Sequence, residues 1–266
     1  MHYLGICAII KDEDPFLDEW MAYYLHLGVT AFYLYDNGSR IPLMHSLKKF
    51  RPLLGVENLR IHAAPGEKVQ MAAYEHCAQT YAAECRWIAF VDMDEFIVPK
   101  QHDSIPAMLE NFTAHAGLAL HWRMFGTNGH AVPPVGLQIE NYTRVTGPDD
   151  PYNLHIKSIV KPGTVKFFPS PHACGLKNKN DVIVTERGEK VTSGLVNSPS
   201  WEVGQINHYY YRSKKDYYAK LRKPRADNNE LRSIPGGKVA APRGGEEDLS
   251  ALRFADGVKA ILARLA

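Results

Sequence analysis

Residues 87–96 have the sequence Trp87-Ile88-Ala89-Phe90-Val91-Asp92-Met93-Asp94-Glu95-Phe96. The five apolar residues that open this stretch predict a short strand buried on both faces, as in a parallel sheet. The strand ends at three acids within four positions, and open α/β folds place their ligands at that rim of the sheet. Carboxylates there are hard oxygen donors for Mg²⁺ or Mn²⁺, which are typically shared with a substrate phosphate. The stretch therefore predicts a metal-dependent enzyme that acts on a phosphorylated or nucleotide substrate.

The D-x-D pattern alone is not specific. Asp12-Glu13-Asp14 also fits it, yet this second match precedes Pro15 and is typical of a helix start. The preceding buried strand favours a metal site at Asp92 and Asp94, but a solvated strand end would explain the same residues.

The composition is that of an ordinary soluble globular protein. The chain has 266 residues, of which 45% are hydrophobic and 23% charged, enough for one large α/β domain or for a domain with a small appendage. The net charge of +2 gives no field that would attract nucleic acid, so we expect no nucleic-acid partner. No apolar run reaches the roughly 18 residues of a membrane span, and the N-terminus lacks a basic region and a cleavage site. We therefore expect a cytoplasmic protein.

The cysteines agree with that expectation. The chain has four, Cys7, Cys77, Cys85 and Cys174, and no CxxC pair. We interpret them as reduced, structural thiols.

The first half of the chain alternates strand and helix. Strands are predicted at 3–10, 30–35, 59–63 and from residue 87 onward. Helices are predicted from Asp14 to Gly28, near 45–50 and over 68–83. This alternation predicts a parallel sheet with right-handed crossovers.

The second half has a different pattern. Strands are expected at 117–122 and 205–211, with short β-like runs at 157–161, 165–168 and 181–185 inside an irregular region. A basic helix is predicted over 213–223, a linker over 234–245 and a final helix over 246–265. We expect the final helix to dock on the main domain, with a membrane-surface or partner contact as the alternative.

Several segments together resemble the family-92 and related family-2-like glycosyltransferases. The resemblance covers roughly residues 3–225, and its motifs stand in the family's order: Lys11-Asp12-Glu13, Leu17-Asp18-Glu19-Trp20 to Leu27-Gly28-Val29, Tyr33-Leu34-Tyr35-Asp36-Asn37-Gly38-Ser39, Trp87 to Pro99, Phe125-Gly126-Thr127-Asn128-Gly129-His130, Ile156-Lys157-Ser158-Ile159-Val160-Lys161-Pro162, and Asn207-His208-Tyr209-Tyr210-Tyr211-Arg212-Ser213 with Lys220. Tyr24 departs from the pattern, because the family often has His there.

The resemblance implies a GT-A fold of the α/β class, with a Rossmann-like, mostly parallel central sheet flanked by helices. Residues 1–100 would form the nucleotide-binding half and 101–233 a mixed acceptor-side half, followed by a linker and C-terminal helix over 234–266. It also implies a nucleotide-sugar donor, with a UDP-sugar expected, a glycan or glycolipid acceptor, Mn²⁺ or Mg²⁺, and transfer with inversion. Such a transferase suggests glycan assembly at the inner face of a membrane, with peripheral contact through the last helix.

The resemblance assigns roles on the donor side. The cation would be held by Asp92, Asp94 and His208, although a core histidine is the alternative for His208. Glu95 would orient a ligand or cap the next helix, and we favour the cap. The nucleotide sugar would contact Lys11, Glu13, Asp36, Gln70, Tyr74, Asp92, Met93, Arg212 and Lys220, residues that ordinary surface and turn polarity could also explain.

The acceptor side is assigned by the same resemblance. The platform would consist of Trp122, Phe125, Gly126, Thr127, Asn128, Gly129 and His130. Inverting transfer also needs a general base, for which His130, Asp149 and Asp150 are candidates that no spacing argument separates. His172 matches a family histidine to which we assign no role.

Two other functions stay open at this point. A haloacid-dehalogenase-type phosphohydrolase would use Asp92 as its nucleophile, but its motif usually lies near the N-terminus and is followed by a small turn rather than Glu95-Phe96. A non-catalytic nucleotide-sugar binder would keep the fold and lack turnover.

Overall fold

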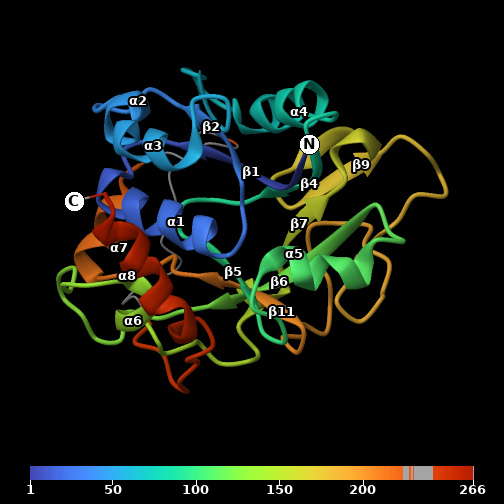
Figure 1. Cartoon of the computed structure of the whole chain (residues 1–266). Helices are drawn as coiled ribbons and strands as arrows, with labels where there is room; N and C mark the ends of the chain where they lie inside the picture. Colours follow the sequence, from blue (N-terminus) through green and yellow to red (C-terminus); the bar gives the residue numbers. More distant parts are fainter. Residues whose placement is uncertain (224–227, 229, 231–241, 266) are drawn as a thin grey trace.

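The computed structural model describes residues 1–223, 228, 230 and 242–265, which form a nine-stranded sheet with helices on both sides (Figure 1). Strands run in the order β3-β2-β1-β4-β7-β6-β11-β5, and β10 pairs with β6. The first four are parallel to one another: β3 (Leu59–Ala63), β2 (Ala31–Asp36), β1 (His2–Ile10) and β4 (Cys85–Phe90). The predicted parallel α/β sheet is confirmed.

The crossovers of this half are helical, as expected. They contain α1 (Asp14–His26), α2 (Leu43–Ser46), η1 (Lys48–Phe50), α3 (Arg51–Leu54) and α4 (Gln70–Thr80). The single short helix predicted near 45–50 is therefore a series of short turns, and Pro52 stands in the first turn of the last of them.

The second half extends the sheet with strands of both directions. Strand β7 (Ile156–Val160) is antiparallel to β4 and to β6 (Gly117–Met124). Next come β11 (Gly204–His208), parallel to β6, and β5 (Glu95–Pro99), antiparallel to β11. Strand β10 (Ile183–Thr185) pairs with β6, and β8 (Val165–Ser170) and β9 (Ala173–Leu176) form a separate hairpin. This mixed arrangement agrees with the predicted acceptor-side half.

The residues after the D-M-D sequence correct one prediction. Glu95 caps no helix, because it begins strand β5, which lies along β11. The next helix is α5 (Ile105–Leu109), with η2 (Glu110–Phe112) after it, and its N-cap is Ser104, whose hydroxyl accepts from the Ala107 N–H.

The C-terminal segment is less helical than predicted. After α7 (Lys214–Leu221), only η6 (Leu252–Phe254) and α8 (Ala255–Ala263) are helical within the predicted 246–265. Residues 242–248 instead form backbone bonds, including a bridge between Glu247 and Arg144. Of the predicted linker, 234–241 lie outside the described residues, as does the predicted domain boundary.

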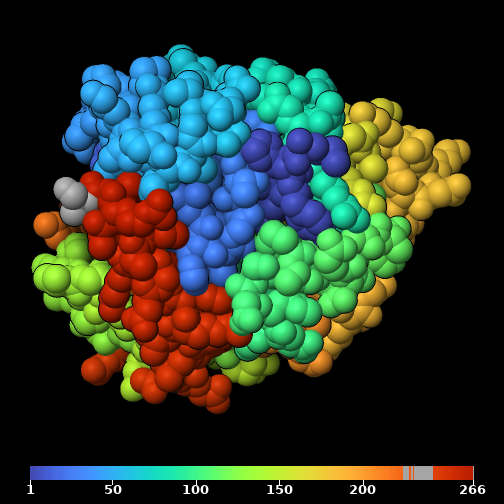
Figure 2. All heavy atoms as spheres, in the orientation of Figure 1, coloured from blue at the N-terminus to red at the C-terminus, as the bar shows by residue number. Residues whose placement is uncertain are grey.

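Helix α8 docks on the main domain, as predicted. It packs against α1, with Val258 fully buried, and Phe254 and Ala255 belong to the main hydrophobic core (Figure 1). In the space-filling view the red C-terminal segment lies directly against the blue helix α1 (Figure 2). Within the described ranges, the structure contains no helix with the length and apolar character needed to cross a membrane.

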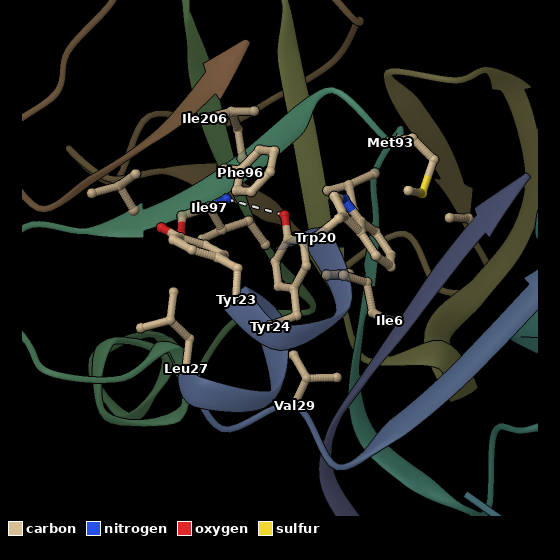
Figure 3. Close-up of a cluster of buried hydrophobic side chains, with 14 of the residues drawn as sticks. Ile6, Trp20, Tyr23, Tyr24, Leu27, Val29, Met93, Phe96, Ile97 and Ile206 are labelled. Atoms are coloured by element: carbon tan, nitrogen blue, oxygen red, sulfur yellow. Dashed lines mark hydrogen bonds between the residues drawn. The ribbon is translucent and has the colours of Figure 1, made fainter. Parts of the chain in front are cut away.

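Three aromatic residues of α1 fix the segment that carries the acids. Trp20 donates from Nε1 to the Asp92 carbonyl at 3.2 Å, and Tyr23 donates to the Ile97 carbonyl at 2.9 Å. Tyr24 donates to the Glu95 carbonyl at 2.9 Å and accepts from the Ile97 N–H at 3.1 Å, as Figure 3 shows for the second bond. The buried face of α1 therefore positions the D-M-D loop through its backbone.

Candidate active site

A cavity of about 500 Å³ lies at the carboxyl ends of β1 and β4, the edge at which the sequence placed the ligand. Most of the predicted donor-side residues line it: Lys11, Glu13, Gln70, Asp92, Met93, Asp94, His208 and Lys220. Trp122 lines it from the acceptor side. The structure thus brings residues from both ends of the chain to one place.

Asp92 is held by three side chains. Its Oδ1 accepts from Gln70 Nε2 at 3.1 Å and from Tyr74 Oη at 3.4 Å, which explains why these two helix residues face the same way. Its Oδ2 accepts from Lys157 Nζ at 3.0 Å. Burial opposes ionisation of Asp92, but the Lys157 ammonium offsets this and lowers the pKa of the carboxyl below its usual value.

Lys157 is a site residue that the sequence did not single out, although it stands in one of the quoted motifs. Its side chain is 1% exposed, and its ammonium lies 3.0 Å from Asp92 Oδ2 and 3.4 Å from Glu95 Oε2. Burial lowers the pKa of Lys157, but Asp92 and Glu95 raise it more, so the lysine stays charged.

Glu95 completes this buried group. It accepts from Trp122 Nε1 at 2.8 Å and from the Asp92 N–H at 2.9 Å. Burial raises the pKa of Glu95 to about 8, and Lys157 limits the rise. Glu95 therefore ties Trp122 to the D-M-D loop instead of capping a helix.

Asp94 and His208 lie together on another wall of the cavity. His208 Nε2 is 3.4 Å from Asp94 Oδ2, and the Lys220 ammonium contacts the same oxygen. Burial opposes ionisation of Asp94, but Lys220 and His208 bring its pKa well below the usual value. Burial lowers the pKa of His208 despite Asp94, which favours the neutral imidazole that metals bind.

The predicted cation can be tested against these donors. Asp94 Oδ2 and His208 Nε2 lie 3.4 Å apart, and the Lys220 ammonium contacts the same oxygen of Asp94. Asp92 is turned toward Lys157, and among the described residues no group of three or more His, Cys, Asp or Glu side chains could hold a metal. Asp94 and His208 are therefore the two donors that would hold a cation, which would complete its shell from a bound ligand.

Arg212 does not line the cavity, contrary to the role predicted for it. Its Nη1 donates to Glu13 Oε2 at 2.8 Å, its Nη2 to the Met93 carbonyl at 3.0 Å and its Nε to Gln138 Oε1 at 2.8 Å. With its donors directed at protein acceptors, the guanidinium supports the D-M-D loop from behind.

Asp36 is likewise absent from the cavity wall. Its two carboxylate oxygens accept from the Ser39 N–H at 2.8 Å and the Leu43 N–H at 3.0 Å, which makes it the acceptor of its own turn. The neighbouring Asn37 lines the cavity instead.

The segment from Phe125 to His130 forms a structural junction, whereas the sequence assigned it to the acceptor platform. Phe125 and Thr127 are fully buried, and the N–H groups of Thr127 and Asn128 donate to the carbonyls of Pro242 and Arg243. A Cβ on Gly126 would lie 2.5 Å from the Gly244 nitrogen, so only glycine allows this close approach. Gly129 contacts the Arg243 side chain in the same junction.

An aromatic shelf lines the cavity instead of that segment. Rings of Trp122 and His155 stack with centroids 4.6 Å apart, and Tyr152 stacks on His155 at 6.0 Å. All three line the cavity, at or near the short turn η3 (Pro151–Leu154). Sequence patterns did not single out His155 and Tyr152, because these residues lie in an irregular segment.

The predicted general bases lie elsewhere. His130 points its Nε2 at the Asn141 carbonyl, 3.3 Å away, and Asp150 caps η3 by accepting from the Tyr152 N–H. Asp149 is exposed, and none of the three lines the cavity. His155 and His172 do line it.

His172 has a defined tautomer. Its Nδ1 lies 3.1 Å from the Ile156 carbonyl, an acceptor, so Nδ1 carries the proton and Nε2 is the acceptor. Burial, together with the Lys157 charge, lowers the pKa of His172 to about 3. The imidazole is thus neutral and can accept a hydrogen bond.

Known proteins similar to this chain agree with one family. The model described as Glycosyltransferase family 92 matches residues 2–235. The family 92 protein At1g27200 of Arabidopsis thaliana is 28% identical over 234 residues, covering 83% of this chain and 37% of that protein. A family 92 protein of Ricinus communis is 28% identical over 173 residues, covering 60% of this chain and 28% of its own length. The matched part of this chain therefore spans 37% of the first relative and 28% of the second.

Similar solved structures are more distant. TarS of S. aureus (residues 1–349) has a TM-score of 0.40 and 16% identity, covering 61% of this chain and 48% of that chain. HddC from Yersinia pseudotuberculosis has a TM-score of 0.45 and 11% identity, covering 82% of this chain and 97% of that chain.

Proposed function

Because the chain belongs to glycosyltransferase family 92, we propose that it transfers a sugar from a nucleotide-sugar donor to a glycan acceptor in the cavity described above. The observation that supports this most is the convergence of Asp94, His208 and Lys220 at one wall with an aromatic shelf in the same cavity. The haloacid-dehalogenase alternative loses its support, because the family match covers most of the chain.

The donor side suits a diphosphate. Lys220 lies at the metal-type pair Asp94 and His208, and Lys11 and Lys223 line the same cavity. Lysine ammonium groups are common partners of phosphate oxygens. We infer that Mn²⁺ or Mg²⁺ is held by Asp94 and His208 together with the donor diphosphate. When bound, such an ion neutralises charge on the leaving nucleoside diphosphate.

The acceptor side suits a sugar ring. The shelf of Trp122, His155 and Tyr152 offers flat apolar faces, and the Glu95 carboxylate holds the Trp122 ring by its Nε1–H. The Nε2 of His172 can accept a hydrogen bond from a sugar hydroxyl. We propose transfer with inversion, with His155 replacing the three earlier candidates for the general base. The lowered pKa of His172 makes its imidazole too weak a base for that role, so it is left as a hydrogen-bond acceptor.

The first experiment measures binding and turnover separately. UDP binding is measured by calorimetry with and without Mn²⁺, and sugar release is measured over a panel of UDP-sugars. We expect binding that requires Mn²⁺ and slow donor hydrolysis. Asp94→Asn should lose the Mn²⁺-dependent UDP binding and the donor hydrolysis, because it removes a ligand of the cation. His208→Ala also removes a ligand and should raise the Mn²⁺ concentration needed for half-maximal activity.

The control is Asp103→Asn, which removes an acid whose side chain is fully exposed and should change neither readout. Normal activity in Asp94→Asn would refute the cation site. Nucleotide binding without turnover on any donor would favour a non-catalytic binder, and release of p-nitrophenol from its phosphate ester would favour a hydrolase.

A further inference from the structure

A second cavity, of about 260 Å³, lies on the other side of the sheet from the candidate active site. Trp122 lines the first cavity and Arg123, the next residue of β6, lines the second. Successive side chains of a strand point to opposite faces of its sheet, so the sheet separates the two cavities.

Arg123 is a buried cation that forms no ion pair with any of the described residues. Only 9% of the residue is exposed, and within the described part of the chain its guanidinium has no ion pair or hydrogen bond; its Nη1 is fully enclosed without an acceptor. A buried charge that lacks a partner is costly, and the cost falls if an anion binds. Burial accordingly lowers the pKa of Arg123, although Asp248 and Glu246 oppose the change.

The orientation of this guanidinium is fixed. It lies over the Trp201 ring, 4.2 Å from the centroid, and Trp201 is itself held by a 2.9 Å bond from Nε1 to the Trp122 carbonyl. The Trp201 ring covers one face of the guanidinium, whereas the guanidinium N–H groups point outward in the plane of the group. A planar oxyanion that accepts two parallel bonds suits such a group.

The neighbouring cavity residues add donors. Lys100 lines the cavity, and its ammonium donates to Gln205 Oε1 at 3.3 Å. The Ser200 hydroxyl is enclosed behind the cavity wall and has no partner among the described residues. Asp248, which also lines the cavity, accepts from Gln205 Nε2 at 2.9 Å and from the Ser250 hydroxyl. At the rim, Arg187 pairs with Glu202.

We propose that this cavity binds an oxyanion, a carboxylate or a phosphate group, at the Arg123 guanidinium with Lys100 as a further donor. A free small anion and an acidic sugar of a glycan share this chemistry. The site is independent of the proposed transferase activity, because it lies behind β6.

The test measures ligand binding by the full chain at constant ionic strength. Calorimetry and melting curves are recorded with inorganic phosphate, glucuronate and, as the neutral match, glucose, with chloride as the reference salt. The wild type should bind phosphate or glucuronate and ignore glucose. Arg123→Gln should weaken the binding by about tenfold or more, because it removes a charged hydrogen-bond donor.

The matched control is Arg86→Gln, since Arg86 also lies over an aromatic ring, that of Tyr3, but outside the cavity. It should bind like the wild type. Lys100→Gln should weaken binding as well, and it serves as the test if Arg123→Gln fails to fold. The Arg123 comparison also separates this site from phosphate entering the first cavity.

Each outcome decides the proposal. Binding of both anions supports a general oxyanion site, and binding of glucuronate alone supports an acidic sugar. Absence of binding by either anion, or equal binding by the wild type and Arg123→Gln, would overturn it.

Discussion

Lys157 is the residue on which the buried charges of the candidate site depend. It is the only cation in contact with both Asp92 and Glu95 among the described residues, and its ammonium is almost completely buried. Lys157→Met should therefore destabilise the fold by about 3–5 kcal/mol, because it leaves buried carboxyl groups without their partner. Urea denaturation measures this change.

Lys161→Met is the matched control at the end of the same motif. Lys161 donates to the Thr113 carbonyl and lies over the Trp87 ring, and none of the described carboxylates pairs with it. Lys161→Met should lower the free energy of unfolding by less than Lys157→Met does. Adding Glu95→Gln to Lys157→Met should restore part of the lost stability. Equal losses in both lysine variants would show that Lys157 matters only through packing.

His172 should make the stability of the protein depend on pH. Its pKa is about 3 in the folded chain against an ordinary 6.5, so the unfolded chain binds more protons between these values. Stability should be complete above pH 6.5 and fall as the pH drops toward 3, by up to about 2.5 kcal/mol near pH 4.5. His172→Asn, which can still donate to the Ile156 carbonyl, should flatten this part of the profile. The exposed His45→Asn should not, and identical profiles for all three proteins would contradict the assignment.

At the scale of elements, helix α1 and strand β5 are joined by two tyrosines with unequal roles. Tyr24 both donates to the Glu95 carbonyl and accepts from the Ile97 N–H, whereas Tyr23 donates to the Ile97 carbonyl alone. Tyr24→Phe should lower the free energy of unfolding by about 1–3 kcal/mol beyond the small cost of changing the ring itself. The reason is that two buried backbone groups lose their hydrogen-bond partner.

Tyr23→Phe is the internal control, because the same atom is removed from the same helix. Denaturation of both variants should rank Tyr24→Phe as the less stable. The reverse ranking would show that the Tyr24 bonds are dispensable, and the positioning of the D-M-D loop would then rest on Trp20.

At the scale of the whole molecule, Gly126 is where the segment after β6 meets the C-terminal segment. A Cβ at this position would lie within 2.7 Å of backbone atoms of Arg243 and Gly244. Gly126→Ala should lower the free energy of unfolding by about 1–3 kcal/mol, because the two backbones must separate to make room for the Cβ. Proteolysis should also cut residues 242–250 faster in this variant. Gly147→Ala, where a Cβ meets nothing within 4 Å, should leave the stability and the rate of proteolysis unchanged. A Gly126→Ala protein as stable as the wild type would show that the segment can shift freely.

Local patterns predicted the parallel half of the sheet and the place of the acids, because each strand and helix there has its own periodicity. Strand β5 escaped prediction because Glu95 follows an acidic run that resembles a helix start, and its pairing partner β11 lies far along the chain. The role of Lys157 was not predicted because its partner Asp92 lies 65 residues away along the chain. Arg212 was given a ligand role because its partner Glu13, 199 residues away, cannot be seen from its own neighbourhood.

The docking of α8 also bears on where this protein can be cut. The family match ends at residue 235, yet Phe254 lies edge-on to Tyr23 with ring centroids 6.0 Å apart, and Val258 is fully enclosed. An expression fragment trimmed to the family boundary would keep every residue that lines the candidate active site. It would also uncover the apolar side of the helix that holds the D-M-D loop, so its low yield or aggregation would report a damaged core and give no information about catalysis.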